Sequence, residues 1–158
     1  MTILIATDGS DVAITAARQG LVLLRNAGHL TVLSVGDEIL DDGAGGIEGP
    51  LYTPEEEETA RENELKLARA AIASTRAAIV DVEPNAVIDE RVETGDPAAT
   101  ICRVAEELEA DAIILGSHGK GFLARTFLGS VSEHVIRHAP CPVLVVRSRK
   151  ADDRGTKS

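Results

Sequence analysis

Short apolar runs alternate with longer amphipathic stretches along the 158-residue chain. The runs are rich in Val, Ile and Leu and end at turn-forming residues, which predicts strands at 2–7, 30–35, 86–93, 112–115 and 142–146. The stretches between them carry apolar residues at helical spacing, which predicts helices at 12–27, 54–79, 98–109 and 131–138. Strands that alternate with helices indicate an α/β fold, a single doubly wound five-stranded parallel sheet flanked by helices.

Local signals mark the predicted helices. The first helix is expected to stop at Gly28. Its expected core-facing residues are Ala13, Ala17, Gly20, Leu21 and Leu24. At the start of the second helix, Thr53, Pro54 and Glu56 have the spacing of a capping box with Pro at the first helical position. The residues of this helix that are expected to face inward include Ala60, Leu67 and Ala71.

Two segments lack periodicity. Residues 36–52 are rich in Gly and acidic side chains, and a loop of this length is usually a functional lid or a mobile segment. Residues 148–158 are polar and are expected to form a frayed tail after a single domain at 1–147.

Composition excludes several classes of function. Hydrophobic residues make up 44% of the chain but aromatics only 2%, so the core is aliphatic and a stacking platform for single-stranded nucleic acid is not expected. The net charge of -10 argues against binding to duplex nucleic acid. No apolar run is long enough to span a membrane, and no signal peptide is evident, so we expect a cytoplasmic protein. Cys102 and Cys141 are expected to be reduced core residues.

The strongest chemical signal is a glycine-rich loop after the fourth predicted strand. It runs Gly116-Ser117-His118-Gly119-Lys120-Gly121 and continues to Gly129-Ser130-Val131-Ser132 at the start of a helix. Glycine lets a backbone approach a ligand closely, and exposed N–H groups at a helix start favour phosphate. The loop fits neither the Walker A pattern nor the dinucleotide pattern GxGxxG after a first strand. The alternative is an ordinary surface loop with a Ser cap.

The spacing Gly116-x2-Gly119-x9-Gly129-Ser130 resembles the nucleotide-binding pattern of the universal stress protein family, Gly-x2-Gly-x9-Gly-Ser/Thr. The segments ILIATDGS, ADAIILGSHGKG and CPVLVV and the turn at Gly95 are similar to that family too, so the resemblance covers nearly the whole chain. It implies a Rossmann-like fold of the adenine nucleotide alpha hydrolase-like type. It also implies a regulatory stress-response module that binds ATP, with Mg²⁺.

The resemblance implies these nucleotide-binding residues: Ala6, Asp8, Val35, Gly116, Ser117, His118, Gly119, Gly129, Ser130, Val131 and Ser132. In that layout the segment from Gly129 to Ser132 cradles the phosphates, and Val35 offers its backbone to adenine. Asp8 lies at the nucleotide and is a weak candidate ligand for Mg²⁺. Ala6 stands where the ATP-binding branch often has Pro.

Several of these residues also have simpler interpretations. Asp8 can cap the first helix instead of meeting a ribose or Mg²⁺. His118 can be a solvated loop residue, and so can Lys120 and Arg125, the basic residues of the motif. His134 and His138 have a spacing that permits a metal pair, but we interpret them as surface residues at a helix C-terminus. The acidic run Glu55–Glu58 favours a helix start.

Three functions compete at this point. The first is an adenine nucleotide sensor with little catalysis, with ATP, AMP and cyclic AMP all open. The second is a slow ATPase or phosphotransferase, for which Asp8, His118 and Lys120 supply pieces but no clear carboxylate pair. The third is a structural dimer without a ligand, which the entropic cost of the loop glycines argues against. The resemblance also implies a homodimer, and the apolar run Pro142–Val146 is the expected contact.

Overall fold

The computed structural model describes residues 1–36, 53–119 and 128–147. In chain order the elements are β1 (Thr2–Ala6), α1 (Asp11–Leu23), β2 (His29–Gly36), α2 (Pro54–Ile79), β3 (Val87–Thr94), α3 (Pro97–Glu107), β4 (Ala112–Gly116), α4 (Ser130–His138) and β5 (Val143–Val146). Every predicted strand and helix is present, with ends shifted by a few residues. The largest shift is at α1, which ends at Leu23 because Leu24, with φ -96° and ψ 51°, has already left the helical region.

The strands form one parallel sheet in the order β3-β2-β1-β4-β5, which confirms the predicted fold class. The chain builds outward from β1 to β3 and then returns to the other side of β1 with β4 and β5. The direction of winding therefore reverses between β1 and β4. In open parallel sheets, ligands bind beyond the carboxyl ends of the strands at this point.

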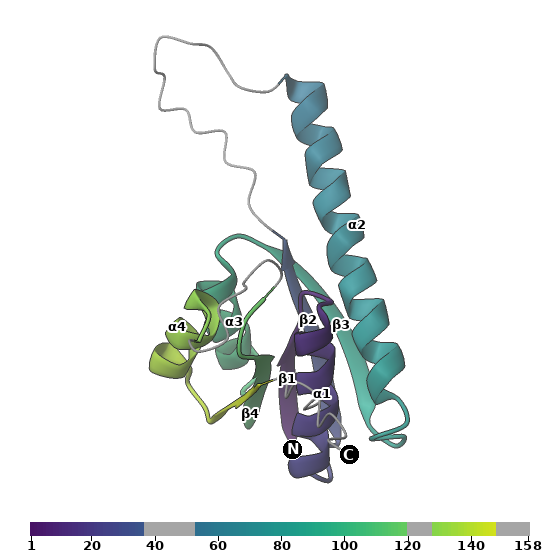
Figure 1. Ribbon diagram of the computed structural model, residues 1–158, viewed down its shortest axis with the longest axis vertical. Helices are drawn as coiled ribbons and strands as arrows, with labels where there is room; N and C mark the ends of the chain where they lie inside the picture. Colours follow the sequence, from purple (N-terminus) through teal and green to yellow (C-terminus); the bar gives the residue numbers. More distant parts are fainter. Residues whose placement is uncertain (37–52, 120–127, 148–158) are drawn as a thin grey trace, which may run out of the picture.

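Helices cover both faces of the sheet, α1 and α2 one face and α3 and α4 the other (Figure 1). The side chains of β1 alternate between the two layers. Ile3 and Ile5 pack in the core beneath α1 and α2, whereas Leu4 and Ala6 pack in the core beneath α3 and α4. Both cores are aliphatic, as the composition predicts.

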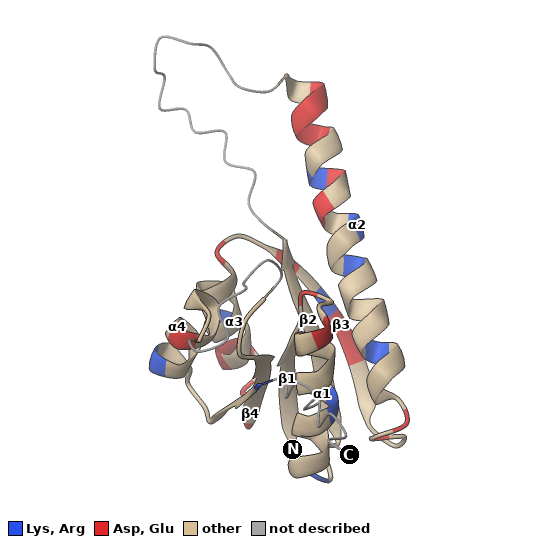
Figure 2. Cartoon of the chain, in the orientation of Figure 1, with Lys and Arg blue, Asp and Glu red and all other residues tan. Residues whose placement is uncertain are grey.

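The N-terminal part of α2 extends beyond the sheet, with acidic side chains on its first turns (Figures 1 and 2). The predicted capping box is present, since the Thr53 hydroxyl accepts from the Glu56 N–H and the Glu56 carboxylate accepts from the Thr53 N–H. Ala71 is buried as expected. The prediction that Leu67 faces the core was wrong, because its side chain is 56% exposed.

The two edges of the sheet differ in character. β3 exposes charged residues. Its Arg91 forms one ion pair of 2.6 Å with Glu93, also on β3, and another of 2.6 Å with Glu107 of α3. Arg103 of α3 completes this group, at 3.0 Å from Glu93. At the other edge, β5 has the apolar sequence VLVV, with its first three residues half-buried. None of the helices in the described part of the chain is both long and apolar enough to cross a membrane.

Candidate functional site

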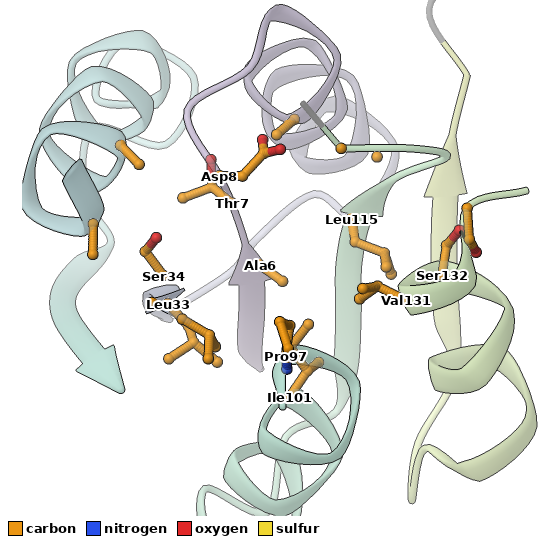
Figure 3. Close-up of a pocket in the computed structure, with 18 of the residues that line it drawn as sticks. Ala6, Thr7, Asp8, Leu33, Ser34, Pro97, Ile101, Leu115, Val131 and Ser132 are labelled. Atoms are coloured by element: carbon orange, nitrogen blue, oxygen red, sulfur yellow. Dashed lines mark hydrogen bonds between the residues drawn. The ribbon is translucent and has the colours of Figure 1, made fainter. Parts of the chain in front are cut away.

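A pocket of about 610 Å³ opens at the carboxyl ends of β1, β2 and β4 (Figure 3). The predicted site residues that line it are Ala6, Asp8, Val35, Gly116, His118, Gly119, Gly129, Ser130, Val131 and Ser132. These residues come from four separate segments of the chain, which the parallel sheet brings together at one edge. Lys120 and Arg125 lie outside the described residues.

Ser117 is the predicted site residue that does not line the pocket, and it is buried. Its carbonyl oxygen accepts from the Gly129 N–H at 2.7 Å and lies 2.9 Å from the Ser132 hydroxyl. The Ser132 hydroxyl also lies 2.9 Å from the Gly129 carbonyl oxygen. Ser132 thus uses its hydroxyl hydrogen to hold the two glycine segments together.

Asp8, which follows β1, and Gly119, which follows β4, lie close together at the carboxyl ends of these strands. A Cβ atom on Gly119 would stand 2.9 Å from Oδ2 of Asp8, so a side chain at this position would require the carboxylate to move. Ser10, and not Asp8, caps α1: its hydroxyl accepts from the Ala13 N–H, while Asp8 Oδ1 accepts from the Ser10 N–H at 3.0 Å.

Helix α4 points its N-terminus at the pocket, with Ser130, Val131 and Ser132 at the lining. Its N-cap is Gly129, and within the described residues no side chain caps it. The helices α1, α2 and α3 are capped by the side chains of Ser10, Thr53 and Asp96. The first N–H groups of α4, with the positive end of the helix dipole, are thus directed toward this end of the pocket.

Val35 presents main-chain groups at the other end of the pocket. The β1–β2 ladder ends where the Thr7 N–H donates to the Leu33 carbonyl at 2.9 Å. Alternate residues of a strand direct their main-chain N–H and C=O groups to the same side. The N–H and C=O of Val35 therefore point to the β1 side, as those of Leu33 do. Val35 lies beyond the end of β1, where none of the described strand residues is opposite these groups. A donor and an acceptor therefore stand side by side at the pocket.

The sequence did not reveal two parts of the pocket wall. An apolar floor is formed by Leu33 of β2, Pro97 and Ile101 of α3, Leu115 of β4 and Val131 of α4, of which only Val131 was among the predicted site residues (Figure 3). A second wall comes from α2 and consists of Glu64, Leu67, Ala68 and Ala71. The helical spacing of this second group was visible in the sequence, but not that its face meets a pocket.

Other reactive side chains lie away from the pocket. His134 and His138 are exposed, with ring centroids 4.2 Å apart, and the described residues contain no cluster of three metal-binding side chains. Both cysteines are free and half-buried. Burial raises the pKa of the Cys102 thiol, and burial followed by the charge of Asp111 raises the pKa of Cys141. These thiols are therefore mostly protonated near neutral pH.

Comparisons with known proteins agree with this architecture. The sequence model of the Universal stress protein family matches residues 1–147. A protein of Staphylococcus haemolyticus named as a universal stress protein is 35% identical over 151 residues, 94% of this chain and 85% of that protein. The solved structure of universal stress protein UspA from Lactobacillus plantarum has a TM-score of 0.71 and 30% identity, covering 93% of this chain and 97% of that one. A universal stress protein in complex with cAMP has a TM-score of 0.62 and 25% identity, covering 94% and 98%. This chain belongs to the universal stress protein family.

Proposed function

We propose that this protein binds ATP, together with Mg²⁺, in the pocket at the carboxyl ends of β1, β2 and β4. The observation that carries the proposal is that one pocket has two different groups at its ends. At one end is the N-terminus of α4, without a described side-chain cap, and at the other are the main-chain N–H and C=O of Val35. The first suits phosphate and the second suits a base. A pocket of about 610 Å³ is also of the size that small-molecule sites usually have.

The phosphates would lie against the first turn of α4. N–H groups at Ser130 and Val131 would donate to phosphate oxygens, and the helix dipole favours negative charge there. The Ser130 hydroxyl is exposed and can add a further donor, whereas the Ser132 hydroxyl already serves main-chain carbonyls. Asp8 would hold Mg²⁺ through its carboxylate, since oxygen ligands suit this ion.

The adenine would lie at the β2 end. Adenine N1 is an acceptor and its 6-amino group a donor, side by side, which matches the N–H and C=O of Val35. The apolar floor around Leu33 and Ile101 would meet the face of the base. A structural neighbour in complex with cAMP supports an adenine ligand in this fold.

The protein would turn ATP over slowly or not at all. Phosphoryl transfer requires a group that orients the attacking water, beside the metal and the terminal phosphate. Among the described residues, the carboxylates that line the pocket are Asp8 and Glu64, and Glu64 lies on α2, at the opposite end from α4. We therefore propose a regulatory module in which nucleotide binding favours one conformation that a partner recognises.

We further propose that the module is a homodimer joined through Pro142–Val146 and acts in the cytoplasm. β5 is an edge strand with an apolar sequence, as a strand that pairs with its twin requires. The two free thiols suit a reducing compartment.

Calorimetric titration of the nucleotide-stripped protein with ATP and Mg²⁺ tests the proposal. We expect micromolar binding by the parent chain. Gly129→Val should abolish it, because the new side chain would stand at the start of α4, where a Cβ already lies 3.3 Å from the Cα of His118.

Gly28→Val is the matched control, since Gly28 is exposed, lies away from the pocket, and has Met1 N at 4.0 Å as the nearest atom to an added Cβ. It should bind ATP as the parent does. Thermal unfolding of all three proteins verifies that they are folded. An absence of ATP binding by the folded parent would refute the proposed function.

A further inference from the structure

One face of α2 forms a wall of the pocket. Its lining residues begin with Glu64. Leu67, Ala68 and Ala71 follow Glu64 by three, four and seven positions, which places all four on one side of the helix. Ala68 and Ala71 are buried, while Leu67 is 56% exposed and Glu64 is half-buried. The outer half of this wall thus presents an apolar side chain and a carboxylate to the pocket.

The position of this wall relative to β1 is fixed by a close contact. Gly9 has a φ of +75°, and a Cβ atom there would stand 2.9 Å from the Cα of Ala71. Only glycine lets the turn after β1 lie this close to the α2 backbone. Because Glu64 is two helical turns before Ala71 on the same face, its place at the pocket is set by this contact.

Glu64 lies over the carboxyl end of β2. A Cβ atom on Gly36 would be 3.6 Å from the Cβ of Glu64 and 3.8 Å from its Oε2. Gly36 follows Val35, whose C=O is directed toward the pocket. The Glu64 carboxylate and the Val35 carbonyl therefore both lie at the carboxyl end of β2, where each can present an acceptor to the pocket.

We propose that Glu64 selects the 6-amino group of the purine and so makes the site specific for adenine. This inference rests on the proposed function and deepens it. An amino group has two hydrogens, so one can be donated to the Val35 carbonyl and the other to the Glu64 carboxylate. Hydrogen bonds to an ionised acceptor are the stronger kind.

The same pair of acceptors rejects a 6-oxo purine. Guanine and hypoxanthine carry a carbonyl oxygen at this position, which would meet two acceptors without a hydrogen between them. Selection against such a base comes from leaving partially buried polar groups unpaired. Leu67 contributes apolar contact to any purine and does not distinguish among them.

Calorimetric titration with three nucleotides tests this role: ATP, inosine triphosphate with its 6-oxo group, and purine riboside triphosphate, which has hydrogen at that position. In the parent, ATP should bind more than about tenfold more tightly than purine riboside triphosphate, which can make neither the bond to the Val35 carbonyl nor the bond to the charged Glu64. Glu64→Ala should reduce this preference about tenfold and leave only the part that comes from the Val35 carbonyl. Glu64→Gln should bind inosine triphosphate better than the parent does, because its amide can donate to the 6-oxo group.

Two controls separate this role from others. Glu62→Ala removes the same charge from an exposed position of α2 outside the pocket lining, and should keep the parent's preference. Leu67→Ala should weaken ATP and purine riboside triphosphate by the same factor. If the parent binds ATP but Glu64→Ala keeps the parent's ratio of affinities, the inference is overturned and the proposed function stands. If the folded parent binds none of the three nucleotides, both are overturned.

Discussion

The hydroxyl group of Thr7 donates a hydrogen bond to the hydroxyl group of Thr75 over 2.8 Å, in the buried space between β1 and α2. The direction follows from the neighbours. Thr75 donates its own hydrogen to the Ala71 carbonyl at 2.9 Å, and Thr7 accepts from the Gly9 N–H at 3.1 Å. The end of β1 is thus joined to α2 by a chain of hydrogen bonds in which each hydroxyl both donates and accepts.

Breaking this chain should destabilise the fold. Thr75→Val keeps the shape of the side chain but leaves the Thr7 hydroxyl without its acceptor, which should cost about 1–3 kcal/mol of unfolding free energy. Urea unfolding measures the change. Thr59→Val is the matched control, since Thr59 makes the same bond to the carbonyl four residues back, at Glu55, on the exposed part of α2. It should change stability by less than about 0.5 kcal/mol, and equal losses for the two variants would contradict the prediction.

Stability should fall in acid through the ion pairs of β3 and α3. Hydrogen bonds from Arg91 lower the pKa of Glu93 and of Glu107 below their ordinary value of 4.5, with a further contribution from Arg103. Groups with a lowered folded pKa stabilise the fold fully above their unfolded pKa, and this stabilisation is lost as the pH falls through the folded pKa. The loss should therefore occur below about pH 5.

Arg91→Ala tests this pH dependence. The variant should be less stable than the parent at neutral pH, and the difference should shrink between about pH 5 and pH 3. Urea unfolding across that range measures it. Arg69→Ala, at an exposed position of α2, should show no such convergence. A difference between Arg91→Ala and the parent that stays constant with pH would refute the assignment.

Self-association should depend on β5. Val145→Asp places a charge on the half-buried apolar edge strand and should weaken the proposed dimer, which sedimentation velocity measures. Val87→Asp makes the same change on β3, the opposite edge, where Val87 is 59% exposed, and should leave association unchanged. A Val145→Asp variant that is folded and sediments like the parent would count against a dimer through this strand.

Local sequence patterns predicted the fold and the position of the site. Each strand is an apolar run, and each helix has its own periodicity, so the alternation along the chain was enough to indicate a parallel sheet. Parallel strands then place the loops after β1, β2 and β4 at one edge. Asp8, Val35 and Gly116, which are far apart in the sequence, were assigned to one site by the family resemblance, and this topology explains why they line one pocket.

The details that the sequence could not supply depend on contacts between distant segments. Leu67 has the spacing of a core residue, but α2 is longer than the sheet it covers, so Leu67 lies at the pocket and not in the core. Ser132 has the position of a phosphate donor. Its hydroxyl donates a hydrogen bond to the carbonyl oxygen of Ser117, a contact between residues 15 positions apart.

The contrast between the two sheet edges limits the size of any assembly built by strand pairing. A strand added at β3 would have to displace or neutralise the charged side chains there. They include Asp89, which is hydrogen-bonded to His29, and Glu90, which forms an ion pair with Arg76. Of the two edges of the described sheet, β5 then remains for pairing, and a two-fold contact between two such strands uses both of them. Assembly would then stop at a closed dimer. Raising the protein concentration should therefore increase the fraction of dimers without producing filaments.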